Sequence, residues 1–256
     1  MNYIVGYSSN IGNKKEVNQD SSIVQIAKSP HGRIALFVVC DGMGGLSDGE
    51  LASATVIRGL NNWFNEEIPT LDFSGLTAED ICININNVIE VLNNKILEYG
   101  KKNRAPLGTT LTLMLVVDTN YYICQVGDSR AYRLTKQLNQ LTKDQTLVAR
   151  EVERGNLTEE EAKRDKRRNI LLQCIGAKKE IEPEFLAGKL AYNETFLICS
   201  DGFYRKLKDS EITEIASNKL LTTSKALTNK AEELIEIVKS RKEVDNITAI
   251  IIKTIE

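Results

Sequence analysis

Residues 37–45 read FVVCDGMGG, an apolar run that leads directly into an aspartate and a glycine-rich turn. The apolar stretch from Ile34 to Cys40 is typical of a buried strand, so we expect Asp41 to lie where that strand leaves the core. Glycine at position 42 lets backbone approach an ion or a substrate closely. The stretch therefore predicts both a central strand of the fold and a carboxylate at the edge of the core.

The same arrangement recurs along the chain. FLICSDG (196–202) repeats the apolar run followed by Asp-Gly, and YYICQVGDSR (121–130) places Gly-Asp just past a strand. Asp20 and Asp245 lie close to the start of two further apolar strands. One aspartate at a strand end is usually a turn residue or a helix cap. Five such positions favour a shared site.

Carboxylates that converge repel one another, and a bound dication is the usual compensation. Oxygen ligands without histidine or thiolate favour magnesium, manganese or calcium over zinc. The five cysteines show no CxxC spacing and the chain has one histidine, so a zinc site is poorly supported. Two hard cations would hold a bridging water, lower its pKa and direct it at a phosphoryl centre. The residue types thus predict a metal-assisted hydrolase.

The bulk composition sets further limits. A chain of 256 residues suits one large domain, and a net charge of -2 gives no electrostatic case for nucleic acid or an anionic membrane. No apolar run approaches the roughly 20 residues of a membrane helix, and the N-terminus does not resemble a signal peptide. Cysteines in apolar runs fit reduced thiols, so we expect a cytoplasmic protein.

Periodicity predicts the order of the elements. Strands are expected at 3–8, 21–27, 34–40, 109–117, 121–126, 130–134, 181–189, 194–199 and 246–253, and helices at 51–65, 77–99, 209–217 and 224–239. The short connections between the strands at 109–117, 121–126 and 130–134 predict an antiparallel meander. Hairpin strands with helices in two blocks favour the α+β class.

The stretch from Lys143 to Arg168 is highly charged and predicts two short helices in an exposed appendage. Its basic cluster at 163–168 is typical of a solvated face, and contact with a phosphorylated partner is the alternative interpretation.

Five motifs stand in one order along nearly the whole chain: NQD (18–20), DGMGG (41–45), GDSR (127–130), CSDG (199–202) and DNIT (245–248). In this order they resemble the metal-dependent protein phosphatases of type 2C. The resemblance implies one catalytic domain over 1–256 with a four-layer αββα sandwich, in which helices flank two antiparallel β-sheets, and a small helical flap at about 144–168. It also implies hydrolysis of phosphoserine and phosphothreonine in proteins, without a phosphoenzyme intermediate, by a water between two Mn²⁺ or Mg²⁺ ions.

The resemblance also implies a role for single residues. The metal-binding set would be Asp20, Asp41, Gly42, Asp128, Asp201 and Asp245, of which Asp41, Asp201 and Asp245 form the catalytic core. Asp41 would bridge two ions, and Gly42 would add its carbonyl. Asp20 would act through waters in the metal shell. Asp128 would share a third, weaker ion with Asp201.

Two positions depart from the family pattern. Lys15 stands where arginine usually binds the substrate phosphate, so we expect binding by a point charge with less precise orientation. Lys14 is an alternative donor, and an exposed lysine pair without a role is also open. Met43 replaces a histidine that several relatives place there as an acid. His31 lies at the far end of the strand, roughly 20 Å from Asp41, so the leaving-group proton is expected from water.

The resemblance implies phosphorylated proteins as partners, namely the substrates of a bacterial-type serine/threonine kinase and the kinase itself. The chain is expected to be a monomer. One alternative is a non-catalytic sensor or binding module, against which the retained carboxylates argue. Another is a phosphatase dedicated to one regulator protein or to a small phosphorylated molecule.

Overall fold

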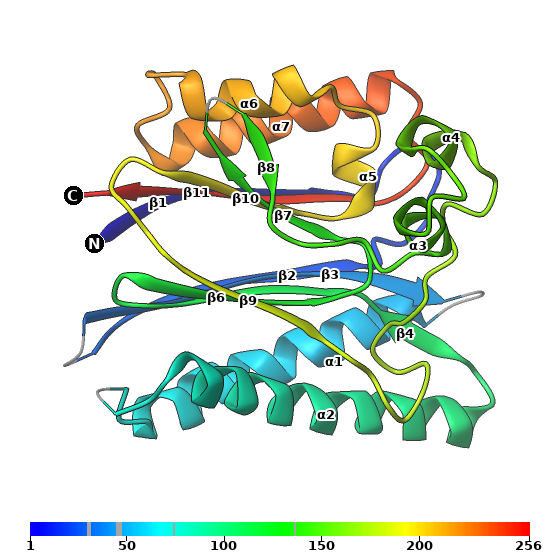
Figure 1. The fold of residues 1–256 in the computed structure, drawn as a ribbon, viewed down its shortest axis with the longest axis horizontal. Helices are drawn as coiled ribbons and strands as arrows, with labels where there is room; N and C mark the ends of the chain where they lie inside the picture. The colour runs from blue at the N-terminus through cyan, green and yellow to red at the C-terminus, as the bar shows by residue number, and fades with distance from the viewer. Residues whose placement is uncertain (30–31, 45–47, 74, 136) are drawn as a thin grey trace.

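The computed structural model describes residues 1–29, 32–44, 48–73, 75–135 and 137–256, so His31 lies outside the described residues. Two antiparallel sheets pack face to face (Figure 1). The first sheet contains β1 (Asn2–Asn10), β11 (Ile247–Ile255), β10 (Thr195–Cys199), β7 (Arg130–Leu134) and β8 (Leu138–Gln140), in that order. The second contains β2 (Asp20–Ser29), β3 (Gly32–Gly44), β5 (Leu111–Val117), β6 (Asn120–Val126) and β9 (Glu184–Lys189), with β4 (Leu107–Thr109) paired to β3.

Helices cover the outer face of each sheet, which confirms the predicted four-layer α+β sandwich (Figure 1). α1 (Gly49–Asn62) and α2 (Ala78–Asn103) cover the second sheet, and α1 continues through a π-helical turn (Trp63–Glu67) into a 3₁₀ turn (Ile68–Thr70). α6 (Asp209–Ser217) and α7 (Ser224–Ser240) cover the first sheet. α3 (Leu147–Glu153), α4 (Glu159–Arg164) and α5 (Asp201–Tyr204) lie together at one end of the sandwich.

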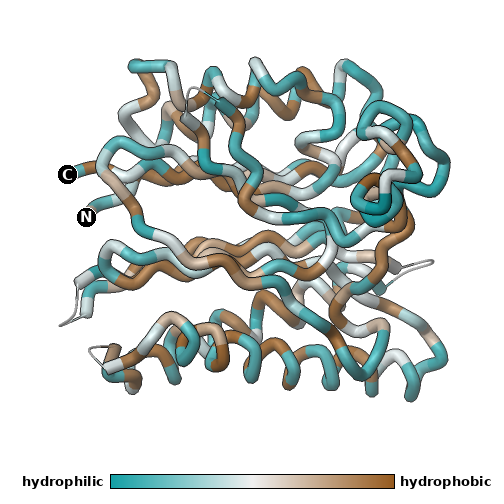
Figure 2. Tube along the Cα trace, viewed as in Figure 1, coloured by the Kyte–Doolittle hydropathy of each residue, from teal (hydrophilic) through white to brown (hydrophobic). Residues whose placement is uncertain are grey.

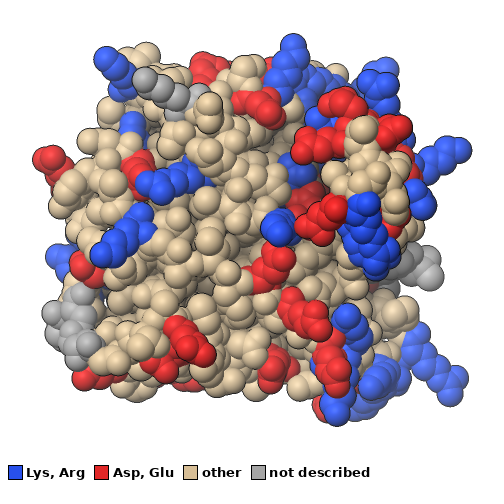
Figure 3. Space-filling view, viewed as in Figure 1, with Lys and Arg blue, Asp and Glu red and all other residues tan. Residues whose placement is uncertain are grey.

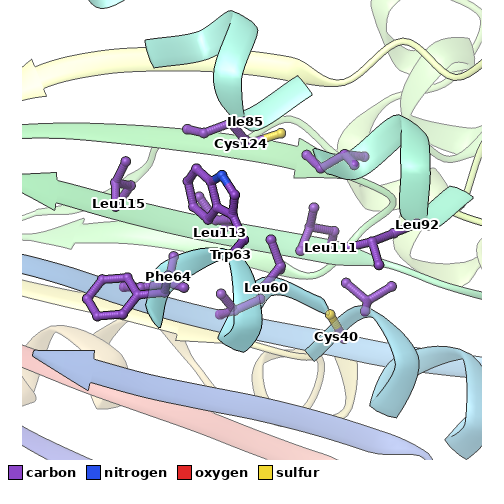
Figure 4. Packing of buried hydrophobic residues seen from close by; sticks show 14 of the residues in the cluster. Cys40, Leu60, Trp63, Phe64, Ile85, Leu92, Leu111, Leu113, Leu115 and Cys124 are labelled. Carbon is purple, nitrogen blue, oxygen red and sulfur yellow. The ribbon is translucent and has the colours of Figure 1, made fainter. Parts of the chain in front are cut away.

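Three apolar layers hold the sandwich together, and the hydrophobic residues run along the strands (Figure 2). β3 belongs to two of these layers because successive side chains of a strand point to opposite faces. Its residues Leu36 and Val38 pack under α1 and α2 (the layer of Figure 4), whereas Phe37 and Val39 pack between the sheets. A strand that is buried on both faces has to be apolar throughout, which explains the continuous run before Asp41.

Local sequence fixes where the long helix α2 begins. Thr77 Oγ1 accepts a hydrogen bond from the Asp80 amide, and the Asp80 side chain accepts one from the Thr77 amide. This reciprocal capping box confirms the helix start that the sequence predicts. The two predicted short helices of the charged appendage are confirmed as α3 and α4.

The predicted three-strand meander is wrong in its last strand. β5 and β6 form a hairpin, but β7 pairs with β10 and β8 in the first sheet. The connection Gly127–Asp128–Ser129 crosses from one sheet to the other, since three residues span about the 10 Å between stacked sheets. Gly127 has a φ of 102°, a left-handed conformation that favours glycine. The crossing places Asp128 between the two sheets rather than in a hairpin turn.

Two smaller differences concern strand ends. β3 does not stop at Asp41 but continues to Gly44, where it pairs with β4 instead of β5. The short strand β8 is absent from the sequence prediction, because its residues Leu138–Gln140 carry little apolar pattern. Among the described residues, no helix has both the length and the apolar character that a membrane crossing requires.

We expect Leu113→Ala to destabilise the protein by about 3 kcal/mol, because the side chain is fully buried in β5 and its loss leaves a cavity (Figure 4). Urea unfolding followed by circular dichroism measures this change. Val91→Ala is the control: that side chain on α2 is 66% exposed, so the free energy of unfolding should change by less than about 0.5 kcal/mol. Equal effects of the two substitutions would contradict the assigned layer.

Candidate metal centre

Carboxylates from both sheets meet at the end of the sandwich where α5 lies (Figure 1). Asp20 and Asp41 are direct partners in the β2–β3 register. Asp201 follows β10 and opens α5, and Asp245 precedes β11, the neighbour of β10. α5 packs closely on the second of these segments, since a Cβ on Gly202 would lie 2.1 Å from the Asn246 carbonyl oxygen. The structure therefore brings together the carboxylates that the sequence analysis singled out.

Burial and the charges of neighbouring carboxylates raise the pKa values of these groups. Desolvation raises the pKa of Asp41 well above its usual value, and the negative charges of Asp20, Asp201, Asp128 and Asp245 raise it further. Desolvation raises the pKa of Asp20 to about 7, although hydrogen bonds to its side chain oppose the shift. Desolvation together with the charge of Asp201 raises the pKa of Asp128 to about 8. The cluster thus carries more negative charge than its surroundings neutralise.

Two buried carboxylate oxygens of the cluster indicate a cation site. Asp20 Oδ1 and Asp201 Oδ1 are buried, and neither accepts a hydrogen bond within the part of the chain that the structure describes. A buried carboxylate oxygen without a donor is costly, and a divalent cation satisfies it. The donor set is oxygen only, which suits magnesium or manganese. The residues present therefore fit such an ion.

Cations of the chain itself already hold two of the carboxylates. Lys15 Nζ lies 2.8 Å from Asp245 Oδ1, and Arg205 Nη2 lies 2.7 Å from Asp201 Oδ2. Over the described ranges, no three acidic, imidazole or thiol side chains converge tightly enough to enclose an ion as they stand. Asp245 and Asp201 are each paired with a cation of the chain in this arrangement. Closer convergence requires these side chains to move.

Lys14 and Lys15 are both exposed, but the Lys15 side chain reaches the cluster. Desolvation lowers the pKa of Lys15, but its hydrogen bond to Asp245 and the charges of Asp245, Asp41 and Asp201 outweigh that effect and raise the pKa. The Lys15 side chain is 38% exposed, so its ammonium group stays accessible from solvent. Of the two candidate donors, Lys15 is the one that the structure places beside the carboxylates.

The backbone of Asp41 is held by threonines that the sequence analysis did not single out. The Asp41 amide donates to Thr110 Oγ1 at 2.9 Å, and its carbonyl accepts from the Thr110 amide at 2.9 Å. Thr109 Oγ1 also donates to that carbonyl, at 3.0 Å. Gly42 is packed so tightly that a Cβ would lie 2.2 Å from the Gly49 carbonyl oxygen. Only glycine fits there, which explains the residue that follows Asp41.

A chain of hydroxyl groups positions Asp20. Ser200 Oγ donates to Asp20 Oδ2 at 2.8 Å, and Ser200 Oγ itself accepts from the Thr248 amide at 3.0 Å. Thr248 Oγ1 lies 2.8 Å from Ser9 Oγ, to which the Asn18 side chain donates. The motifs NQD, CSDG and DNIT are therefore joined by hydrogen bonds through their small polar residues.

Asn246 is a positioning residue that sequence reasoning missed. Its buried side-chain amide accepts from the Gln19 amide at 2.9 Å and donates to the carbonyls of Ile11 and Val17, at 2.9 and 3.2 Å. It therefore ties the loop that carries Lys15 and leads to Asp20 to the start of β11. An asparagine directly after a candidate ligand was the available signal.

The Gly127–Ser129 crossing is connected to the helical appendage. The Gln145 amide donates to the Gly127 carbonyl at 2.9 Å, and Gln145 Oε1 accepts from the Gly127 amide at 2.7 Å. Arg130 donates to both oxygens of Asp144, at 2.8 and 2.7 Å, and stacks over the Tyr204 ring at 3.7 Å. The segment LTKDQT thus fixes the start of the appendage beside Asp128.

Two other candidates have surroundings of a different kind. Met43 lines a cavity of about 600 Å³ between the C-terminal end of α2 and the segment around Cys174, whose lining mixes apolar residues with Lys101 and Arg104. Charges of both signs mix over the α3–α4 region (Figure 3). In the basic cluster, Lys163 pairs with Glu160 and Arg167 pairs with Asp165. Such local pairing favours the solvated-face interpretation, and contact with a phosphorylated partner stays a prediction.

Comparisons with known proteins agree on one group of enzymes. A family model described as "Protein phosphatase 2C" matches residues 9–243. The serine/threonine phosphatase stp of Listeria monocytogenes is 31% identical over 221 residues, which cover 85% of this chain and 84% of that protein. The solved serine/threonine phosphatase of S. agalactiae superposes with a TM-score of 0.86 at 29% identity, covering 99% of this chain and 100% of that one. The catalytic domain of PstP, solved in complex with two manganese ions, has a TM-score of 0.80 at 26% identity, with 100% of both chains covered.

The raised pKa values predict how stability depends on pH without metal. Because the pKa of Asp20 is about 7 and that of Asp128 about 8 in the folded chain, folding favours their protonated forms. This contribution is fully present below the pKa of an unfolded aspartate, about 4, and is lost as the pH rises through the folded values. The melting temperature of the metal-free protein should therefore fall from about pH 5 to about pH 8.

Millimolar Mn²⁺ should reverse that trend, because a cation binds the deprotonated carboxylates. We expect the ion to raise the melting temperature by about 5 °C or more at the higher pH, and by less at the lower pH. Differential scanning fluorimetry with and without EDTA measures both effects. A metal-free protein that becomes more stable towards the higher pH would contradict the electrostatic assignment.

Proposed function

The chain belongs to the protein phosphatase 2C family, and on that premise we propose that Asp41, Asp201 and Asp245, with Asp20 beside them, form the centre that holds two divalent cations. The protein is a metal-dependent serine/threonine protein phosphatase. The relatives are phosphatases, which confirms an enzyme over a non-catalytic sensor. The observation that carries the site is the pair of buried oxygens, Asp20 Oδ1 and Asp201 Oδ1, that accept no hydrogen bond from any described residue.

Two cations bound at these carboxylates would supply a lowered water pKa and charge compensation for a phosphoryl group. The chain's own contribution is positioning. Thr110 fixes the backbone of Asp41, and Ser200 fixes one oxygen of Asp20 and leaves the other for a cation. These supports come from β-strands and their immediate ends, which hold side chains more rigidly than free loops. Gly42 remains the proposed source of a carbonyl ligand.

We assign the substrate phosphate to Lys15. Its ammonium group carries a full charge and lies 2.8 Å from a carboxylate of the cluster, and the side chain is 38% exposed, so a phosphoryl group bound beside the cluster is within its reach. Lys15 can serve either Asp245 or a phosphate, since both require the same three donors. An ammonium group is a point charge without the fork of arginine, so it attracts phosphate but fixes its orientation less.

Several finer features belong to the same proposal. We propose Mn²⁺ or Mg²⁺ as the resident ions, phosphorylated proteins as substrates, and reversal of phosphorylation by a bacterial-type serine/threonine kinase as the role. The whole of 1–256 would be one catalytic domain acting as a monomer, with 144–168 as its flap. A cytoplasmic location is supported by the cysteines, which are all free thiols.

Hydrolysis of p-nitrophenyl phosphate and of a phosphothreonine peptide tests the centre. We expect activity with Mn²⁺, loss of activity in EDTA, and a fall in kcat/KM of about a thousandfold for Asp41→Asn, since metal assistance is worth several kcal/mol. Glu232→Gln, an exposed position on α7, is the control and should match the native chain. Activity that persists both in EDTA and in Asp41→Asn would contradict the metal-dependent mechanism.

The role of Lys15 is tested by the KM for the phosphothreonine peptide. Lys15→Met should raise KM by about tenfold, the effect of losing one charge-assisted contact to phosphate. Lys15→Arg should preserve or lower KM, because the guanidinium adds a second parallel hydrogen bond. Lys14→Met is the matched control and should leave KM unchanged. If Lys14→Met raises KM and Lys15→Met does not, the donor assignment is reversed.

A further inference from the structure

Arg205 bridges two carboxylates that the sequence analysis expected to share an ion. Its Nη2 atom lies 2.7 Å from Asp201 Oδ2 and 3.1 Å from Asp128 Oδ2. The Arg205 side chain is 17% exposed, and the side chains of Asp201 and Asp128 are 10% and 5% exposed. The resemblance to type 2C phosphatases implied a third, weaker cation for this pair. In this chain a guanidinium lies between them.

The local fold makes this contact specific. Arg205 follows Asp201 by four residues, one helical turn, and its amide donates to the Asp201 carbonyl at 3.1 Å. The neighbouring Tyr204 hydroxyl donates to the Asp128 carbonyl at 3.1 Å, so the helix end also fixes the segment that carries the second carboxylate. Arg130 in turn stacks on the Tyr204 ring. Arg205 therefore emerges from a held backbone and not from a free loop.

Charge and tethering both favour the guanidinium over a weak ion. Arginine is always protonated in proteins, so it neutralises one of the two carboxylate charges at every accessible pH. As part of the chain, it competes at an effective concentration of about millimolar or higher. A divalent ion would have to displace it or bind beside a positive charge. A cation of only millimolar affinity does not overcome both obstacles.

We propose that Arg205 is the resident cation of the Asp128–Asp201 pair, so that this chain binds two divalent ions and no third. This inference rests on the proposed two-ion centre and adds a positioning residue to it. Arg205 engages Asp201 through Oδ2 and leaves Oδ1, the buried oxygen for which the described residues supply no donor, for the first two ions. It thus divides the two oxygens of one carboxylate between a built-in cation and an exchangeable one.

Metal stoichiometry tests the proposal independently of catalysis. The native chain and its variants are dialysed against Mn²⁺ up to about 10 mM, above the millimolar range of weak sites, and bound metal is counted by elemental analysis. We expect the native chain to saturate at two ions and Arg205→Ala to bind a third. The double variant Arg205→Ala/Asp128→Asn should return to two, because the vacated pair has lost a carboxylate.

Arg133→Ala is the matched control. It removes an arginine that pairs with Glu194 at the other end of β10, and it should bind two ions as the native chain does. Two ions in Arg205→Ala would overturn the proposal, because the pair would then have no latent affinity. Three ions in the native chain, with one lost in Asp128→Asn, would also overturn it, and this comparison needs no Arg205 variant to fold. No bound Mn²⁺ in the native chain would contradict the two-ion centre itself.

Discussion

The burial of carboxylates that also repel one another is the constraint to which the rest of this structure responds. Asp20, Asp41, Asp128 and Asp201 all have raised pKa values, and desolvation is the largest cause in each case. Such groups remain ionised only where hydrogen bonds or cations oppose the cost of burial. Hydroxyl groups, backbone amides, Lys15 and Arg205 supply these hydrogen bonds and positive charges around the cluster. They compensate only part of its negative charge, and divalent cations can compensate the rest.

The fold brings the carboxylates together by stacking two sheets rather than by a continuous motif. Asp20 and Asp41 come from neighbouring strands of one sheet, whereas Asp201 and Asp245 flank neighbouring strands of the other. Asp128 lies on the crossing between the sheets, and Asn246 ties the loop before β2 to the start of β11. A sheet end is a suitable place for such a cluster, because strand ends are rigid and still face solvent on one side.

Sequence reasoning predicted the architecture well, because apolar periodicity and turn residues are local signals. It recovered the strand before Asp41, the capped start of α2 and the α+β class, whereas the four layers were implied by the resemblance to type 2C phosphatases. It assigned β7 to the wrong sheet, since a three-residue connection is short enough for a hairpin and also long enough to cross between stacked sheets. Sequence reasoning could not predict which individual residues contact the carboxylates, for a related reason. That Thr110 holds Asp41, or that Arg205 bridges two aspartates, depends on pairings across the sandwich that no local pattern encodes.

The two basic residues of the cluster differ in exposure, and exposure separates what each can do. The Lys15 side chain is 38% exposed and pairs with Asp245, whose side chain is 28% exposed. An ion pair so close to water is worth little, so Lys15 can exchange its carboxylate for a phosphate at small cost. Arg205 is 17% exposed and contacts two carboxylates that are more deeply buried. Removing one partner from a buried pair is costly, which holds Arg205 in place. A positive charge therefore makes an exchangeable contact at the exposed side of the cluster, through Lys15. It makes a lasting contact at the buried side, through Arg205.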